Sequence, residues 1–128
     1  MRKFFVFLFI AGLMTFTVLK SQAAITFKEA MNQNKPIVIL VYADWADDVQ
    51  PALQKMTDLE RKYSNKYNFV TMNIANEQTK EFNKNYHIYP GLPYILLFKD
   101  NGRISRYLQK SCVLDSSCVS DKMDVFAN

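Results

Sequence analysis

The residues best suited to chemistry are a pair of cysteines near the end of the chain. Cys112 and Cys118 are the only cysteines among 128 residues. Two thiols at this spacing predict either a structural disulfide or a redox pair. Asp115-Ser116-Ser117 precedes Cys118 and is typical of a helix start, where a reduced thiol has a lowered pKa and is reactive. A structural zinc site is disfavoured because no second pair of ligands accompanies the two cysteines.

A second group of candidate residues follows a buried-type strand in the first half of the chain. The run Ile37 to Tyr42 is wholly apolar and is followed by Trp45, Asp47 and Asp48. We expect both acids to lie in the first turn of the next helix or to cap it, rather than to act as general acids or bases. Two carboxylates without further clustered ligands do not predict a metal site. The single histidine, His87, has no Ser or Cys partner visible in the sequence and is expected in a loop.

The elements that position these residues alternate between strands and helices. Apolar periodicity predicts helices over residues 26–34, 49–63, 77–86 and 115–127, and strands over 37–42, 69–74, 94–99 and 103–108. Thr26 and Glu29 form a capping-box pattern, and Asp100-Asn101-Gly102 predicts the tight turn of a hairpin. Strand, helix and strand in succession predict a parallel pair of strands.

The first 23 residues have the pattern of an export signal. A positive start is followed by the almost wholly apolar residues 4–19 and by small residues suited to cleavage. We therefore predict a signal peptide over 1–23 and one domain over 24–128, periplasmic or secreted and without a membrane span after cleavage. An uncleaved N-terminal anchor is the alternative. In an oxidising compartment, the cysteine pair is expected to be disulfide-bonded.

Charge excludes one class of partner. The formal net charge is +4, and the signal region holds three basic residues and no acid, so the predicted domain carries 4 − 3 = +1. The remaining Lys and Arg residues are dispersed rather than clustered. Nucleic-acid binding through a basic patch is therefore not expected.

The chain resembles the thioredoxin family over essentially all of the predicted domain. The matching segments are Tyr42-Ala43-Asp44-Trp45, Asn73-Ile74, Gly91-Leu92-Pro93 and Phe98-Lys99-Asp100-Asn101-Gly102. The resemblance implies an α/β fold, a thioredoxin-like three-layer α/β/α sandwich with a mixed four-stranded central sheet and helices on both faces. It also implies a cis peptide bond before Pro93, next to backbone with which an extended peptide can pair. Alternatively, Pro93 only shapes the turn into its strand.

The chain departs from the family at the residues that carry its redox chemistry. The family has Cys-x-x-Cys after its Trp, whereas Trp45 is followed by Ala46-Asp47-Asp48-Val49. By alignment on Trp45, a buried Asp of the family becomes Leu40, and a buried Lys on the neighbouring strand becomes Thr71. Thiol exchange needs a thiolate and a resolving thiol, so this loop is expected to be redox-inactive.

These observations predict an exported, non-catalytic thioredoxin-fold protein that needs no cofactor and binds a polypeptide or protein partner of the cell envelope. Aromatic residues near the proline loop are the expected anchors. The predicted binding surface consists of Trp45, Tyr89, Leu92, Pro93 and Tyr94. One alternative is a thiol–disulfide oxidoreductase with Cys112 and Cys118 as its catalytic pair. A weaker alternative is a purely structural subunit of an envelope assembly.

Overall fold

A mixed four-stranded sheet forms the centre of the part of the chain described by the computed structural model, residues 25–86, 89–115 and 117–127. Strand β1 (Ile37–Tyr42) runs parallel to β2 (Asn68–Asn73) and antiparallel to β3 (Tyr94–Lys99). Strand β4 (Ile104–Leu108) pairs antiparallel with β3, which gives the order β2-β1-β3-β4. The parallel pair and the hairpin are those predicted from the sequence.

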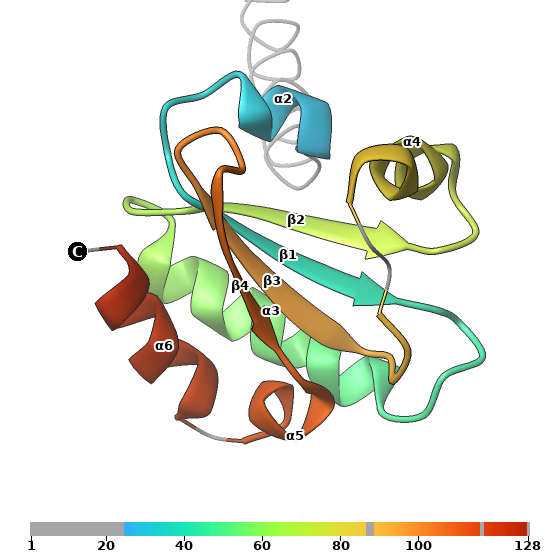
Figure 1. The fold of residues 1–128 in the computed structure, drawn as a ribbon. Coiled ribbons are helices and arrows are strands. Elements are labelled where there is room, and N and C mark those ends of the chain that lie inside the picture. The colour runs from blue at the N-terminus through green and yellow to red at the C-terminus, as the bar shows by residue number, and fades with distance from the viewer. Residues whose placement is uncertain (1–24, 87–88, 116, 128) are drawn as a thin grey trace, which may run out of the picture.

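Two layers of helices enclose the sheet, and Figure 1 shows them on its opposite faces. One layer consists of α2 (Phe27–Met31) and α4 (Glu77–Asn85), and the other of α3 (Val49–Tyr63), α5 (Lys110–Val113) and α6 (Cys118–Phe126). This arrangement confirms the predicted three-layer fold class. No helix among the described residues is both long and apolar enough to cross a membrane. The predicted signal peptide lies outside the described residues.

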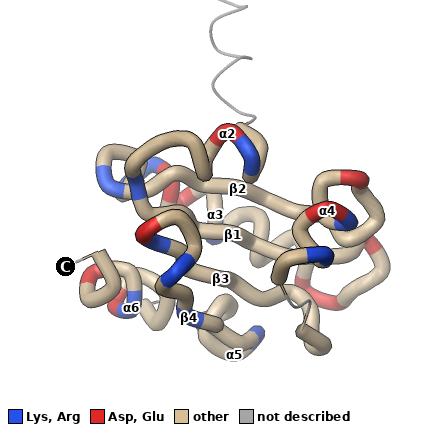
Figure 2. The backbone as a smooth tube through the Cα atoms, turned by 45° about the horizontal axis from the view of Figure 1, so that its top comes forward, with Lys and Arg blue, Asp and Glu red and all other residues tan. Residues whose placement is uncertain are grey.

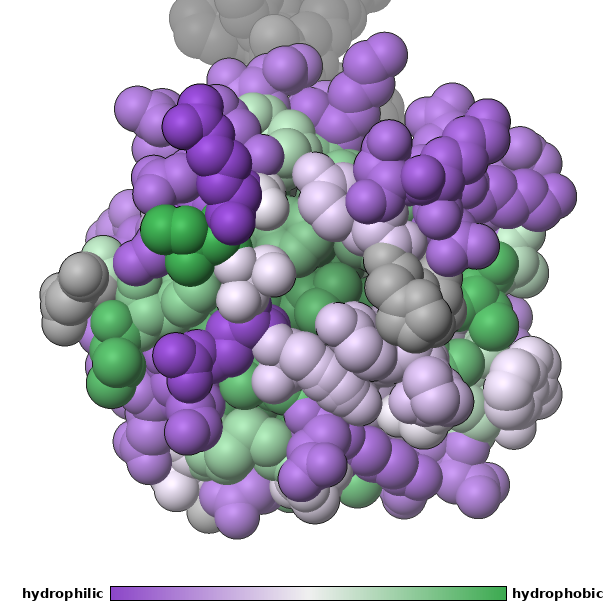
Figure 3. Space-filling view, in the orientation of Figure 1, coloured by the Kyte–Doolittle hydropathy of each residue, from purple (hydrophilic) through white to green (hydrophobic). Residues whose placement is uncertain are grey.

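Strand β1 separates two hydrophobic cores, because its side chains alternate between the two faces of the sheet. Val38 and Leu40 pack with α3 and α6, whereas Ile37, Ile39 and Val41 belong to the core under α2 and α4. A strand covered on both faces reads as a continuous apolar run, as this one does. In the space-filling view, hydrophobic residues lie in a hollow near the middle of the face and are bordered by hydrophilic ones (Figure 3).

The C-terminal region differs from the single helix that we predicted over 115–127. A short helix, α5, comes first, and α6 begins only at Cys118. The Asp115 carboxylate accepts hydrogen bonds from the N–H groups of Ser117 and Cys118. Asp115 thus lies outside the helix and satisfies N–H groups at its start, which is why α6 begins later than periodicity indicated.

A buried hydrogen bond ties α6 to Tyr67, the residue before β2. The Tyr67 hydroxyl donates to the Met123 carbonyl at 2.7 Å, and burial raises the pKa of Tyr67 to about 12. Near the first described residue, Thr26 accepts a hydrogen bond from the Glu29 N–H at 3.1 Å, which confirms the cap predicted for α2.

The hairpin between β3 and β4 turns through three residues in the left-handed region. Asp100, Asn101 and Gly102 have φ values of 53°, 57° and 81°. A Cβ atom at Gly102 would lie 2.8 Å from the hydroxyl oxygen of Tyr86. The Tyr86 ring packs against Phe98, with 5.0 Å between centroids, so the ring cannot move without disturbing the core. Gly102 is therefore required both by its backbone conformation and by this close approach.

We expect Gly102→Ala to lower the free energy of unfolding more than Gly91→Ala does. Gly91 also has a positive φ of 82°, but a Cβ there meets nothing within 4 Å. The left-handed backbone costs Ala about 1–2 kcal/mol at either site, and the contact with Tyr86 adds on the order of 1 kcal/mol at Gly102. Urea unfolding followed by circular dichroism measures both effects.

Tyr86→Phe provides the control, because it removes the oxygen atom that the new Cβ would meet. In that background, the cost of Gly102→Ala should fall to that of Gly91→Ala. An unchanged cost in the Tyr86→Phe background would show that the hydroxyl is not the obstacle.

Candidate functional site

Trp45 projects into solvent from the Trp45 loop (residues 43–48), which connects β1 to α3. Its side chain is 78% exposed, although Ala43 before it and Val49 after it are buried. The N–H of Ala46 donates to the carbonyl of Ala43 at 3.0 Å and closes a turn at the end of β1. The loop thus has buried ends and presents a large aromatic side chain outward.

The prediction that Asp48 caps α3 with its side chain is wrong. It occupies the N-cap position, but its backbone is left-handed (φ 65°) and its side chain makes no hydrogen bond to the helix. The first turn of α3 contains no acidic residue, so Asp47 lies before the helix as well. An N-cap residue normally has extended backbone, which aims its side chain at the first N–H groups. The Asp48 carboxylate instead pairs with Lys110 of α5, with 3.2 Å between Oδ2 and Nζ.

The proline loop (residues 89–93) approaches the sheet just before β3. The peptide bond between Leu92 and Pro93 is cis. Pro93 is buried, Leu92 is half-buried and Tyr89 is 37% exposed. Of the predicted binding residues in this loop, Tyr89 and Leu92 therefore have side-chain surface that a partner can contact.

Tyr94 is fully buried, so the prediction of an exposed anchor at this position is wrong. Its ring stacks on that of Tyr107 from β4, with 5.3 Å between centroids. Tyr89 lies edge-on to both rings, and its N–H donates to the Tyr94 hydroxyl at 3.1 Å. Burial is the main cause of the raised Tyr94 pKa. Tyr94 therefore holds the proline loop from inside the fold.

The two positions behind the Trp45 loop differ in exposure. Leu40 is fully buried in the core under α3, and its register partner Thr71 is exposed on the edge strand β2. A buried carboxylate at Leu40 would need a partner, because burying an unpaired charge is costly. The apolar side chain satisfies this core without one.

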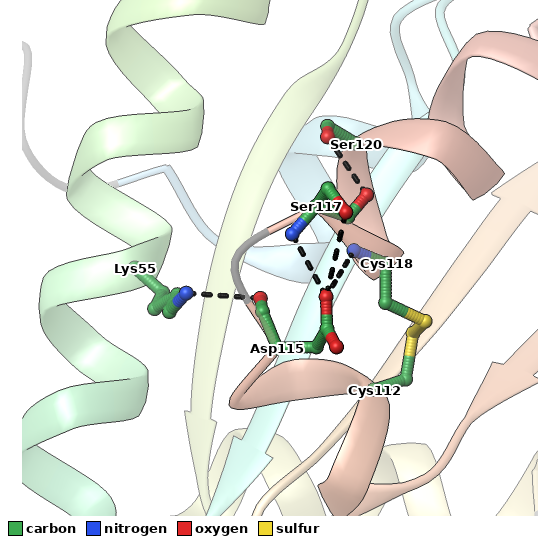
Figure 4. The surroundings of a disulfide bond; sticks show 6 residues. All are labelled: Lys55, Cys112, Asp115, Ser117, Cys118 and Ser120. Carbon is green, nitrogen blue, oxygen red and sulfur yellow. Dashed lines mark hydrogen bonds between the residues drawn. A yellow bond between two sulfur atoms is a disulfide. The ribbon is translucent and has the colours of Figure 1, made fainter.

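Cys112 and Cys118 form a disulfide that joins α5 to the start of α6 (Figure 4). Their Cα atoms are 5.2 Å apart; Cys112 is buried against the core under α3, and Cys118 is half-buried. Hydrogen bonds from the N–H groups of Ser117 and Cys118 hold the pKa of Asp115 below its usual range. Asp115 lies within the loop that the disulfide closes and thus also satisfies N–H groups at the start of α6.

Two lysines connect this C-terminal segment to α3 and its preceding loop. Lys55 Nζ donates to the Asp115 carbonyl at 2.9 Å, as drawn in Figure 4. Lys110, two residues before Cys112, makes the ion pair with Asp48. The resemblance implied that the cysteine segment returns to the same end of the sheet as Trp45, and the ion pair, which the sequence did not predict, ties α5 to the loop that carries Trp45.

The described residues contain no group of three or more His, Cys, Asp or Glu side chains that could hold a metal ion. The predicted loop position of His87 lies outside those residues. Tyr107 and Lys110 are the site residues that sequence reasoning missed. Tyr107 could have been found from strand alternation, because it faces Leu96 of β3 in the hairpin register. Lys110 carried no local signal, since its partner is distant in the chain.

Comparison with known proteins identifies the family. The model of the thioredoxin family matches residues 17–113, which is more than half of the chain. The protein therefore belongs to the thioredoxin family. The germline-specific thioredoxin Deadhead of Drosophila melanogaster has the same fold, with a TM-score of 0.59 at 22% identity over 77% of this chain and 86% of that one.

Two curated relatives are similar in sequence over part of their length. A thioredoxin-like protein, HCF164, from the chloroplast of Arabidopsis thaliana is 26% identical over 62% of this chain and 30% of its own. A thiol:disulfide interchange protein TxlA homolog from Synechocystis is 25% identical over 65% of this chain and 46% of its own. The chain thus spans less than half the length of these relatives.

Asp115 is expected to make the free energy of unfolding depend on pH in the acidic range. Its pKa lies below the ordinary 3.8, so the ionised carboxylate stabilises the fold above about pH 4, and this contribution is lost as pH falls through the folded-state pKa. Asp115→Asn should therefore lose less stability than the wild type between roughly pH 5 and roughly pH 2. Urea midpoints across this range measure the difference.

Glu81→Gln is the matched control, because Glu81 is an exposed acid of α4, away from this segment. Its pH profile should parallel that of the wild type. A wild-type profile for Asp115→Asn would refute the assignment of Asp115 as an acid-sensitive cap.

Proposed function

We propose that this thioredoxin-family protein binds a polypeptide partner at a surface formed by Trp45, Tyr89 and Leu92, with the buried Pro93 shaping the loop beneath them, and that the Trp45 loop performs no thiol chemistry. The observation that carries the proposal is the 78% exposure of Trp45, in a loop that leaves β1 at the end of the sheet where the proline loop enters β3. Tryptophan and tyrosine are the side chains that most often dominate binding energy at protein interfaces. A domain that exposes its only tryptophan in this way has a ready anchor for a partner.

The loss of thiols from the Trp45 loop supports a binding role over catalysis at this site. Ala46 and Val49 stand where the family has its two cysteines, and neither side chain can become a nucleophile. Val49 is buried and Leu40 fills the core behind it, so the position of the resolving thiol has become part of the hydrophobic interior. The exposed part of the loop still presents Trp45 together with Asp44 and Asp47.

We place the protein in an exported compartment, the periplasm or the exterior, with a partner of the cell envelope. The basic and apolar pattern of residues 1–23 supports this location. A disulfide between Cys112 and Cys118 also suits an oxidising compartment.

The proposal predicts that Trp45→Ala weakens polypeptide binding at least about tenfold, as expected for an aromatic anchor. A suitable probe is ribonuclease A that has been reduced, alkylated with iodoacetamide and labelled with fluorescein, because it is permanently unfolded. Fluorescence anisotropy measures its affinity. In the wild type, the emission of Trp45 should shift on binding and thereby locate the contact.

Val125→Ala is the control for general loss of exposed apolar surface. Val125 lies on α6 and is 71% exposed, so its removal should leave the affinity within about twofold. Equal affinities for the wild type and Trp45→Ala would refute the proposed site.

Thiol–disulfide exchange through Cys112 and Cys118 is the second candidate function. It is favoured by the ion pair that brings α5 to the Trp45 loop and by the start of α6 at Cys118. A substrate thiolate would attack the Cys118 sulfur, forming a mixed disulfide and releasing Cys112 as a thiolate. The burial of Cys112 in the core favours a structural bond instead.

An insulin-reduction assay and a measured disulfide potential distinguish these roles. We expect no turnover and a potential below about −300 mV, which are properties of a structural disulfide. Cys112→Ala combined with Cys118→Ala should lower the free energy of unfolding by about 2 kcal/mol, because the disulfide closes a small loop. Turnover that disappears in this double variant would establish the catalytic alternative.

A further inference from the structure

Two exposed carboxylates flank Trp45, and neither has a salt-bridge partner in the described part of the chain. Asp44 and Asp47 lie on either side of Trp45 and are exposed. The ion pairs of the described residues involve Asp48 but neither of these two acids. Lys110 offsets the charge of Asp48, which leaves Asp44 and Asp47 as the acids of the Trp45 loop without an ion pair among the described residues.

Basic residues are absent from both segments that form the proposed binding surface. The sequence has no Lys or Arg between Lys35 and Lys55, nor between Lys84 and Lys99. In Figure 2, the Trp45 loop is coloured for acids and carries no basic colour. A partner that covers Trp45 therefore meets an aromatic ring in a locally negative environment.

The positive end of α3 does not cancel this charge. A helix N-terminus acts as roughly half a positive charge, whereas Asp44 and Asp47 supply two full negative charges beside it. We therefore expect a net negative potential around the Trp45 loop, which would repel a negatively charged partner. A wholly apolar partner would have to remove water from two carboxylates without pairing them, which is unfavourable.

We infer that the partner segment presents an arginine or lysine side chain to Trp45, with the cation over the indole ring and paired with Asp44 or Asp47. This inference rests on the proposed function and names the chemistry of its partner. Trp is the aromatic side chain best suited to a cation–π contact. Arginine suits the site better than lysine because its planar guanidinium stacks on a ring and bonds to a carboxylate at the same time.

The contributions expected at an exposed site are modest but measurable. Each surface ion pair should change affinity by about two- to fivefold, and the cation–π contact by a similar factor. These interactions weaken as salt screens the charges. The site is therefore expected to select among partners by charge, while apolar contacts of Trp45, Tyr89 and Leu92 supply general affinity.

Three matched peptides test the inference on the full protein. The first is acetyl-Gly-Ser-Leu-Arg-Leu-Arg-Ser-Gly-amide, and the others carry Gln or Glu in place of both Arg residues. Emission of Trp45 reports binding, since the peptides contain no tryptophan. We expect the arginine peptide to bind at least about fivefold more tightly than the glutamine peptide, and the glutamate peptide to bind most weakly. The preference should shrink between about 0.05 M and about 0.5 M salt.

Variants assign the preference to the two carboxylates. Asp44→Asn and Asp47→Asn should each lower the affinity for the arginine peptide by about two- to fivefold and leave the affinity for the glutamine peptide unchanged. Asp100→Asn makes the same change at the exposed hairpin turn, at the opposite end of β3 from the proline loop, and should have no effect. Trp45→Leu should lower the affinity for the arginine peptide more than that for the glutamine peptide, because it keeps an apolar side chain but removes the ring. Calorimetry measures both affinities.

The outcomes separate this inference from the proposal on which it rests. Equal binding of the arginine and glutamine peptides at Trp45, or an unchanged preference in the Asp44→Asn/Asp47→Asn double variant, would overturn the inference and leave polypeptide binding intact. If neither the peptides nor the unfolded ribonuclease binds at Trp45, the proposed function fails, and the inference fails with it.

Discussion

Strand β1 is inaccessible to solvent along nearly its whole length, and the positions of both helix layers follow from that constraint. A strand that is apolar on both faces must be covered twice, so α3 and α6 pack on one side and α2 and α4 on the other. This segment of the chain becomes exposed to water only after the strand ends. Trp45 appears at that point, three residues after Tyr42.

The strands and the long helix were predictable because each has a local signature. The apolar run from Ile37 to Tyr42 predicted a central strand, and the stripe that ends at Tyr63 predicted the length of α3. Asp100-Asn101-Gly102 predicted the hairpin turn, and all three residues have the positive φ that such turns use. In these elements, periodicity and turn chemistry agree with the tertiary contacts.

The failed predictions concern residues whose surroundings come from distant parts of the chain. Tyr94 looked like a surface anchor, but Tyr107 of β4 covers its ring. Asp48 looked like a cap, but a left-handed backbone and Lys110 of α5 give its carboxylate another partner. Strand alternation gives a signal for the Tyr94–Tyr107 pairing, whereas the pairing of Asp48 with Lys110 has none in the local sequence. The exposure of Trp45, in contrast, follows from its place just beyond a buried strand.

The tyrosine contacts at the proline loop have a consequence for binding. Tyr89 is held by Tyr94 and Tyr107, two side chains that belong to the sheet rather than to the loop. A partner bound at the proposed surface would therefore meet an aromatic side chain whose orientation is set before contact, and little conformational entropy would be lost on this side of the complex. If the proposed function holds, such preorganisation would allow a small surface with one exposed indole to discriminate between partners.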